Sequence, residues 1–119
     1  RSMVVGRPLA MMFLKKNATV TMCHTKTVEL AKTCREAEVL VAAVGKARMI
    51  TADMVKEGAV VVDVGINVDE QGNLCGDVDF EQAESRTSYI SPVPKGVGSI
   101  TTSVLAKHVI RAAEKTIEC

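Results

Sequence analysis

The sequence predicts an α/β fold, in which helices cover both faces of a parallel β-sheet. Segments with strand character alternate along the chain with segments of helical periodicity. The two clearest strands, residues 39–44 and 59–64, are continuous apolar runs without alternation, which is typical of strands buried on both faces. With 119 residues, the chain has the length of one domain. We therefore expect residues 1–119 to form a doubly wound, Rossmann-like domain.

The first half of the chain is expected to alternate between helix and strand. In chain order, the elements are a helix over residues 8–16, a strand over 18–23, a helix over 28–35 and a strand over 39–44. Pro8 suits the first turn of a helix, because that position needs no N–H donor. The hydroxyl of Thr27 is a good cap for the second helix, and Gly45 ends the apolar run.

The second half continues the same alternation with one excursion. In chain order, we expect a short helix capped by Thr51 and ended by Gly58, a strand over 59–64, a hairpin around Gln71-Gly72, helical turns over 80–85, a strand over 88–91 and a helix over 99–117. Glycine favours the left-handed conformation that ends many helices. The final helix is predicted from apolar residues near helical spacing.

The opening residues, Arg1 to Pro8, have the pattern of a phosphate-binding turn, and no strand precedes them. Such a turn joins a buried strand to the N-terminus of a helix. The helix follows here, so we expect the fold to lack its first strand. Because that strand is central in a doubly wound sheet, its absence is expected to leave unpaired strand edges.

Composition argues against several classes of function. The net charge is +1 without a basic tract, and aromatic residues are rare, so nucleic acid is not an expected partner. No apolar run is long enough to cross a bilayer and no signal peptide is recognised, so we expect a cytoplasmic protein without membrane contact. The four cysteines lack any CxxC spacing, which favours free thiols over a disulfide or metal role.

Five loops are expected at the carboxyl ends of the strands, where ligands bind in this class of sheet. They are Arg1-Ser2, Cys23 to Lys26, Val44 to Lys46, Val64 to Asn67 and Pro92 to Ser99. Each contains glycine, hydroxyl or basic residues, which an ordinary solvated loop would also contain. Together they indicate a nucleotide site, with Gly6 allowing a pyrophosphate to approach the helix N-terminus.

The second loop bears on the choice of cofactor. Sites selective for NAD usually place an Asp or Glu here to accept the ribose hydroxyls. This chain has His24-Thr25-Lys26 instead, and its next acidic residue is Glu29. With Arg1 nearby, a 2′-phosphate would be well received, so NADP is favoured and NAD is the alternative. For His24, a structural role or a ribose contact is favoured over that of a catalytic base.

The acidic residues do not suggest a catalytic or metal site. Asp53 and Asp63 do not form a credible acid–base pair, and Asp53 fits stabilisation of a helix dipole. Asp77 and Asp79 have no histidine or cysteine at ligand spacing, which favours solvated or capping carboxylates over metal ligands. No residue of this chain is therefore assigned a catalytic role, and no metal is expected.

Five motifs, in order, carry a resemblance to a known family. They are Arg1-Ser2-x-x-Val5-Gly6-x-Pro8, Ala18-Thr19-Val20-Thr21-x-Cys23-His24, Val62-Asp63-Val64-Gly65-Ile66-Asn67, Gly76-Asp77-Val78-Asp79-Phe80 and Pro92-Val93-Pro94-x-Gly96-Val97-Gly98-x-x-Thr101. The chain resembles the C-terminal NAD(P)-binding domain of methylenetetrahydrofolate dehydrogenase/cyclohydrolase. That family oxidises methylenetetrahydrofolate to the methenyl form with NADP⁺ or NAD⁺, and usually hydrolyses the methenyl form to formyltetrahydrofolate.

The resemblance implies a role for each motif. Phosphate and ribose contacts fall on Arg1, Ser2, Val5 and Gly6; adenosine-side and 2′-phosphate contacts fall on His24, Thr25 and Lys26. Ala43, Val44, Gly45, Val64, Gly65 and Ile66 would lie along the cofactor, with Thr101 at the nicotinamide end. Pro94, Lys95 and Gly96 would border the folate cleft.

Two positions depart from the family pattern, where Lys95 replaces a glycine and Ser99 replaces a proline. If the glycine position has positive φ, lysine would cost roughly 1–2 kcal/mol of strain. The family's catalytic lysine and its tyrosine partner belong to an N-terminal domain that this chain lacks. Folate would be bound through that missing domain, on which the last helix is expected to pack, and a homodimer is expected. The alternative is a cofactor-binding or assembly module that has lost hydride-transfer chemistry.

Overall fold

The computed structural model describes residues 1–117, and within them the strands form a parallel sheet and a separate hairpin. The sheet has the order β1-β2-β5, from β1 (Val39–Ala42), β2 (Val60–Asp63) and β5 (Tyr89–Ile90). Val39 lies opposite Val60, and Val60 opposite Tyr89, in parallel register. The hairpin pairs β3 (Asn67–Val68) with β4 (Leu74–Cys75) in antiparallel register.

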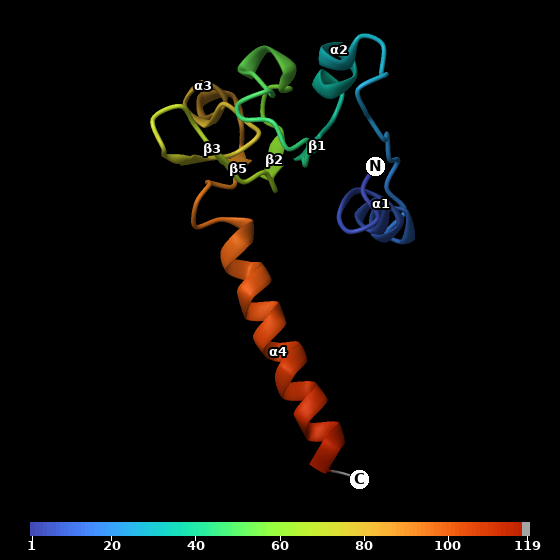
Figure 1. The fold of residues 1–119 in the computed structure, drawn as a ribbon. Helices are drawn as coiled ribbons and strands as arrows, with labels where there is room; N and C mark the ends of the chain where they lie inside the picture. The colour runs from blue at the N-terminus through green and yellow to red at the C-terminus, as the bar shows by residue number, and fades with distance from the viewer. Residues whose placement is uncertain (118–119) are drawn as a thin grey trace.

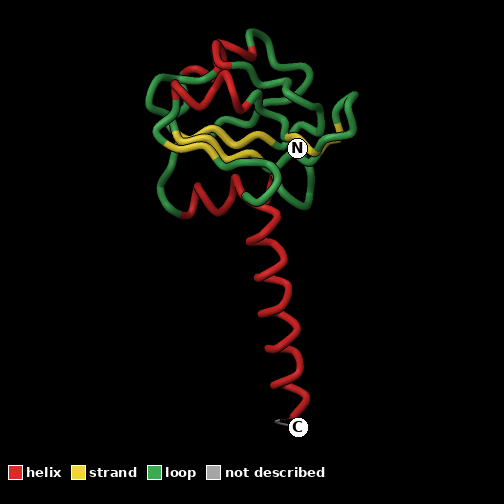
Figure 2. Tube along the Cα trace, turned by 90° about the vertical axis from the view of Figure 1, so that its left-hand side faces the viewer, coloured by secondary structure: helices red, strands yellow, loops and turns green. Residues whose placement is uncertain are grey.

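Helices lie on both sides of this sheet. They are α1 (Gly6–Lys15), α2 (Leu30–Arg35), α3 (Phe80–Ala83) and α4 (Val97–Ile117), with short 3₁₀ turns η1 (Ala52–Met54) and η2 (Glu84–Arg86). Figures 1 and 2 show α2 and α3 on one side of the strands, and α1 and α4 on the other. The predicted α/β architecture is confirmed.

The apolar core lies on the side of the sheet that α2 and η1 cover. Its buried members are Cys34, Ala42, Ile50, Met54, Val55, Ala59, Val61, Val78 and Ala83. Val55 and Val61 are fully buried, and Leu30 and Ala31 of α2 pack against the cluster. Neither α1 nor α4 contributes a buried residue within the described chain. The core is therefore one-sided.

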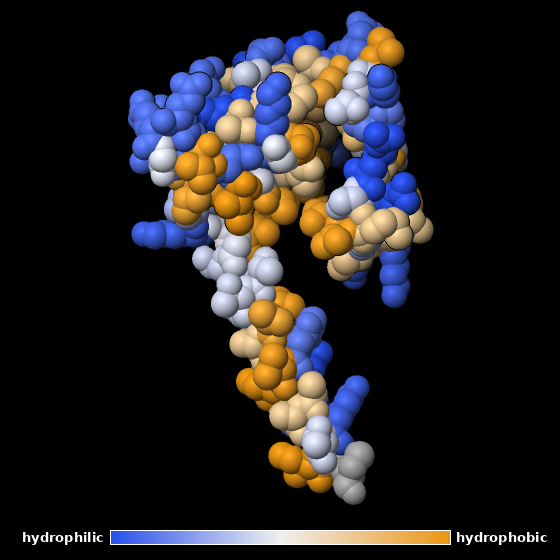
Figure 3. Space-filling view, viewed as in Figure 1, coloured by the Kyte–Doolittle hydropathy of each residue, from blue (hydrophilic) through white to orange (hydrophobic). Residues whose placement is uncertain are grey.

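Helix α4 projects away from the rest of the molecule (Figures 1 and 2). At 1.5 Å per residue, its 21 residues span about 31 Å. The radius of gyration is 16.4 Å, whereas a compact chain of this length would have about 13–14 Å. Ile100, Leu105 and Val109 are among the exposed apolar residues of this helix. Figure 3 shows apolar patches along it.

The predicted strand over residues 18–23 is wrong, because this segment has no strand pairing in the described structure. In the described residues β1 pairs with β2, and β2 pairs with β5, so that no further strand lies beside β1. Residues 18–23 consequently have no neighbouring strand to provide a hydrogen-bond ladder.

The strand predicted over residues 39–44 is real but shorter, and it is not buried on both faces. It ends at Ala42, because the N–H of Val44 donates to the side chain of Asp77 at 2.6 Å. Val39 is 45% exposed. A strand at the edge of a sheet is covered less completely than a central one, which accounts for this exposure.

Of the two predicted helix caps, that of Thr27 is wrong, whereas Thr51 does occupy the N-cap position but makes no capping side-chain bond. The hydroxyl of Thr27 accepts the N–H of His24 at 2.8 Å, and α2 begins only at Leu30, after Glu29 in a left-handed conformation. The hydroxyl of Thr51 donates to the carboxylate of Asp53, and the expected helix is the short turn η1. In both cases, a local side-chain bond competes with the capping bond.

The remaining predicted elements are confirmed. Helices 8–16 and 99–117 correspond to α1 and α4, each of which begins two residues earlier than predicted. The hairpin, the helical turns over 80–85 and the strand over 88–91 are present. Gly58 has φ of +76°, as expected for a left-handed end position.

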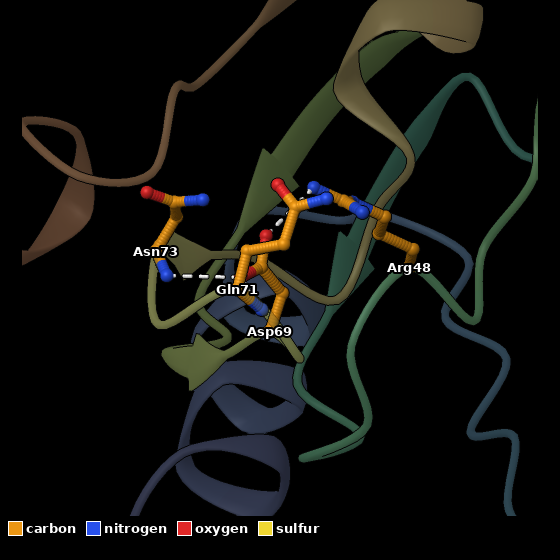
Figure 4. Close-up of polar contacts among 4 residues, drawn as sticks. All are labelled: Arg48, Asp69, Gln71 and Asn73. Atoms are coloured by element: carbon orange, nitrogen blue, oxygen red, sulfur yellow. Dashed lines mark hydrogen bonds and ion pairs between the residues drawn. The ribbon is translucent and has the colours of Figure 1, made fainter.

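Asp69 organises the turn of the hairpin (Figure 4). Its carboxylate accepts the N–H groups of Gln71 and Asn73, both at 2.9 Å, and lies 3.3 Å from the guanidinium of Arg48. The Asn73 N–H lowers the pKa of Asp69 most, and Gln71 and Arg48 add to the effect. The charged carboxylate therefore stabilises the turn.

We predict that Asp69→Asn reduces the pH dependence of stability at acid pH. Because folding lowers this pKa, the stabilisation is complete above the ordinary value of 3.8 and is lost as the pH falls through the lower value of the folded state. Urea unfolding of wild type and variant at a series of pH values measures the effect. Parallel pH profiles for the two proteins would contradict the prediction.

Candidate functional site

A pocket of about 290 Å³ lies at the carboxyl end of the sheet. The loop after β2 and the loop between β5 and α4 form most of its wall. Its lining residues are Asp63, Val64, Gly65, Ile66, Leu74, Pro92 to Ser99 and Thr102. The loops after two neighbouring strands therefore meet at the place where this class of sheet binds ligands.

The structure brings part of the predicted site together in this pocket. Predicted cofactor residues and predicted substrate-cleft residues line the same pocket. The former are Val64, Gly65 and Ile66, and the latter are Pro94, Lys95 and Gly96. From α4, the pocket is lined by Thr102 and not by the predicted Thr101. The hydroxyl of Thr101 donates to the carbonyl of Val97 at 3.1 Å, along the helix itself.

The loop between β5 and α4 is tightly wound. A Cβ atom on Gly96 would lie 2.1 Å from the carbonyl oxygen of Pro92, so only glycine fits there. The preceding residue, Lys95, is exposed and has φ of +72°. Lysine therefore occupies a left-handed position that glycine adopts without strain. The backbone strain expected for a lysine at a position with positive φ is thus present at Lys95.

We predict that Lys95→Gly stabilises the fold by about 1 kcal/mol, because it removes the left-handed strain. Lys95→Ala is the control, since alanine keeps the strain while it removes the charge. Urea denaturation of the three proteins measures the difference. If Lys95→Gly and Lys95→Ala raise the free energy of unfolding equally, the effect comes from the lost charge, and the strain argument is contradicted.

Asp63, at the end of β2, is a buried carboxylate with a complete set of donors. It is 3% exposed. Its oxygens accept the N–H groups of Gly65 at 2.9 Å, Asp77 at 3.1 Å and Val78 at 2.9 Å. Its own N–H donates to the buried hydroxyl of Ser91 at 2.8 Å, next to β5. Asp63 thus fastens the end of β2 to segment 76–79.

Asp77 is the second buried carboxylate, so of the two roles expected for it, solvated or capping, the solvated one is wrong. It is fully buried. Its oxygens accept N–H groups from the loop after β1, from Val44 at 2.6 Å, Gly45 at 3.0 Å and Lys46 at 3.1 Å. The side-chain amide of Asn67 also donates to it, at 2.9 Å. The local sequence gives little indication that Asp77 is buried, because its only apolar or small neighbours are the glycine before it and the valine after it.

Two glycines make room for these carboxylates. A Cβ atom on Gly65 would lie 2.2 Å from Cγ of Asp77. A Cβ atom on Gly76 would lie 1.9 Å from Oδ2 of Asp63. Both distances are far too short for non-bonded atoms in a packed interior, so side chains are excluded at both positions.

We predict that Gly76→Ala destabilises the fold by about 3 kcal/mol or more, because the new methyl group displaces a buried carboxylate from its donors. Gly98→Ala is the matched control, since open space surrounds its Cβ position at the start of α4. We expect Gly98→Ala to be neutral or stabilising by up to about 1 kcal/mol. Thermal unfolding of both variants checks this, and a Gly76→Ala protein as stable as wild type would refute it.

The N-terminal turn places four predicted phosphate or ribose contacts together. The hydroxyl of Ser2 accepts the N–H groups of Val5 at 2.9 Å and Gly6 at 3.4 Å. The main-chain nitrogen of Arg1 lies 3.3 Å from the Cβ position of Gly6. The terminal methyl group of Met22 lies 3.9 Å from the same Cβ position. The segment of residues 18–23 therefore runs beside this turn.

The second predicted loop is a compact turn. His24 Nδ1 accepts the N–H of Lys26 at 3.1 Å, while the His24 N–H donates to the hydroxyl of Thr27. Thr25 and Lys26 are exposed at its tip. The imidazole ring shapes the turn, which supports the structural interpretation of His24 over that of a base.

Cys23, Cys34 and Cys75 are free thiols, and Cys119 lies outside the described residues. Burial raises the pKa of the Cys34 thiol, and the adjacent Cys23 raises it further. Within residues 1–117 there is no cluster of metal-ligating side chains. None of the helices in that range combines the length and the hydropathy that a membrane span requires.

Residues 1–117 match the family model of the tetrahydrofolate dehydrogenase/cyclohydrolase NAD(P)-binding domain. The chain belongs to this family. The resemblance expected from the five motifs is therefore confirmed.

Two bacterial relatives illustrate the extent of the match. The chain is 60% identical over 112 residues to the bifunctional protein FolD of Alkaliphilus oremlandii and 59% identical over 114 residues to that of Clostridioides difficile. The alignments cover 94% and 96% of this chain but only 39% and 40% of the relatives. The chain thus spans about two-fifths of the length of these family members.

Solved structures of the family show the same fold. The bifunctional enzyme FolD of Campylobacter jejuni superposes with a TM-score of 0.92 at 46% identity, over 97% of this chain and 41% of that one. The Trypanosoma brucei methylenetetrahydrofolate dehydrogenase-cyclohydrolase, complexed with NADP and an inhibitor, has a TM-score of 0.88 at 34% identity, over 100% and 43%.

Proposed function

We propose that this chain binds NADP at the carboxyl end of its sheet. The observation that carries the choice of NADP is the loop of residues 24–27, where Thr25 and Lys26 are exposed and no carboxylate stands ready for ribose hydroxyls. A hydroxyl and an ammonium group suit a 2′-phosphate. Membership in an NAD(P)-binding family and the NADP complex of the Trypanosoma brucei relative support the assignment.

The proposed binding mode uses the loops described above. The cofactor would run from Arg1, Ser2, Val5 and Gly6 past Ala43 to Gly45 and Val64 to Ile66. The nicotinamide end would lie near the start of α4, at Thr101 or Thr102. Pro94, Lys95 and Gly96 would then face the folate side of the pocket.

We propose that the complete enzyme oxidises methylenetetrahydrofolate to the methenyl form and hydrolyses that product to formyltetrahydrofolate. Bound NADP⁺ would supply the hydride acceptor. The residues of this chain would orient the cofactor and exclude water, while acid–base groups and the folate site would come from the rest of the polypeptide. The relatives are more than twice as long as this chain and are named bifunctional, which supports the division.

The proposed setting is a cytoplasmic homodimer. Free cysteine thiols suit a reducing compartment. The exposed apolar face of α4 needs a covering surface, which we assign to the remainder of the enzyme. Residues 1–119 would act as its NAD(P)-binding domain.

A second candidate is a cofactor-binding or assembly module without hydride transfer. The left-handed backbone of Lys95 favours it, because a long cation there stands where the pocket would receive folate. Restoring Lys95→Gly and Ser99→Pro in the complete enzyme discriminates the two. A turnover number that rises supports the module hypothesis, and an unchanged one removes its main support.

We predict that calorimetric titration of the chain shows saturable binding with NADP⁺ preferred over NAD⁺. Lys26→Glu should abolish the preference, because it replaces a cation at the 2′-phosphate by an anion. Lys56→Glu is the matched control, since this exposed lysine precedes β2 at the opposite end of the sheet. Binding of neither nucleotide by folded protein would refute the proposed function.

A further inference from the structure

We propose that Asp77 is a positioning residue that presets the loop of residues 43–47 for the cofactor, an inference that rests on the proposed function. Every residue of this loop is exposed. Beneath it, Asp77 is fully buried, and its carboxylate accepts the N–H groups of Val44, Gly45 and Lys46 in succession. One buried carboxylate therefore holds a solvent-facing loop from the inside.

The bonds to Asp77 determine what the loop can offer a ligand. Consecutive N–H groups that converge on one point form an anion-binding concavity. Here the anion is the protein's own carboxylate, so these donors are not available to a cofactor phosphate. Gly45, with φ of +70°, allows the turn that directs the N–H groups inward. The loop would therefore meet the cofactor with its outer, exposed side.

The same carboxylate connects the two loops expected to lie along the cofactor. Asn67, which follows the loop of residues 64–66, donates its side-chain amide to Oδ1 of Asp77. Lys46 donates to that same oxygen. A displacement of Asp77 would therefore disturb the relative position of both loops.

The expected effect of losing Asp77 follows from preorganisation. A loop that holds its binding shape for only a fraction of the time weakens the apparent affinity by that fraction. The stability of the fold would fall as well, so stability alone cannot test the role. The required readout is affinity relative to a variant with comparable destabilisation elsewhere.

The amide of Asn67 allows a test by exchange of partners. In Asp77→Asn, one oxygen becomes an NH₂ group that cannot accept the N–H groups aimed at it. In Asn67→Asp, two carboxylates face each other. The double variant Asp77→Asn/Asn67→Asp restores a donor–acceptor pair between the two positions, and so provides rescue. Val55→Ala is the control, because Val55 is fully buried in the apolar core and is not part of this network.

The experiment measures three quantities on the full chain. They are the Kd for NADP⁺, the urea unfolding midpoint, and the hydrogen-exchange rates of the amides of residues 44–46 without cofactor. For Asp77→Asn we expect a Kd about tenfold higher, as for a loop formed a tenth of the time, and faster exchange in the loop. Val55→Ala should lower the midpoint with neither change. The double variant should bind more tightly than either single variant.

Distinct outcomes separate the two proposals. Wild-type Kd or wild-type loop exchange in Asp77→Asn overturns the positioning role. A folded wild-type chain without NADP⁺ affinity overturns the proposed function, and the exchange rates then still decide whether Asp77 sets the loop. If Asp77→Asn does not fold, Asn67→Asp carries the same comparison with Asp77 in place.

Discussion

The carboxyl end of the sheet depends on two carboxylates, Asp63 and Asp77, buried close to each other in the protein. Among the described residues neither forms a salt bridge, and main-chain N–H groups supply nearly all of the compensation. A buried charge without such donors would cost several kcal/mol. Because the donors come from loops after β1 and β2 and from segment 76–79, the charges can be buried only if all three segments adopt one arrangement.

The relation between the two motifs that supply these residues is reciprocal. Asp63 and Gly65 belong to one motif, and Gly76 and Asp77 belong to the other. The carboxylate of each motif accepts hydrogen bonds from the other motif. Gly65 leaves space for the carboxylate of Asp77, and Gly76 leaves space for that of Asp63. Changing one aspartate therefore leaves donors unsatisfied on the partner segment, and enlarging one glycine displaces the opposite carboxylate. The two motifs form a unit although their aspartates are 14 positions apart in the sequence.

Local pattern was sufficient for most elements, and it failed where distant residues decide. The apolar runs around Val41 and Val61 identify strands because strands buried in a sheet consist mainly of apolar residues. The burial of Asp77 cannot be recognised from its neighbours in the sequence, since its donors lie more than thirty residues earlier in Val44 to Lys46. Residues 18–23 have strand composition, but a strand also needs a partner, which local sequence does not specify. The resemblance to the family located the candidate site; the pattern alone indicated only a nucleotide-binding sheet.

The two anion-binding arrangements near the proposed site differ in how easily a ligand can enter them. At the first turn, the N–H groups of Val5 and Gly6 donate to the hydroxyl of Ser2, which is exposed. A phosphate can replace a neutral, solvent-accessible acceptor at small cost, and a doubly charged group binds N–H donors more strongly than a hydroxyl does. In the loop after β1, the acceptor is the buried carboxylate of Asp77. A phosphate that took over these N–H groups would leave that carboxylate buried without donors, which is costly. A phosphate can therefore compete for the first turn only, and the loop after β1 contributes shape instead of charge.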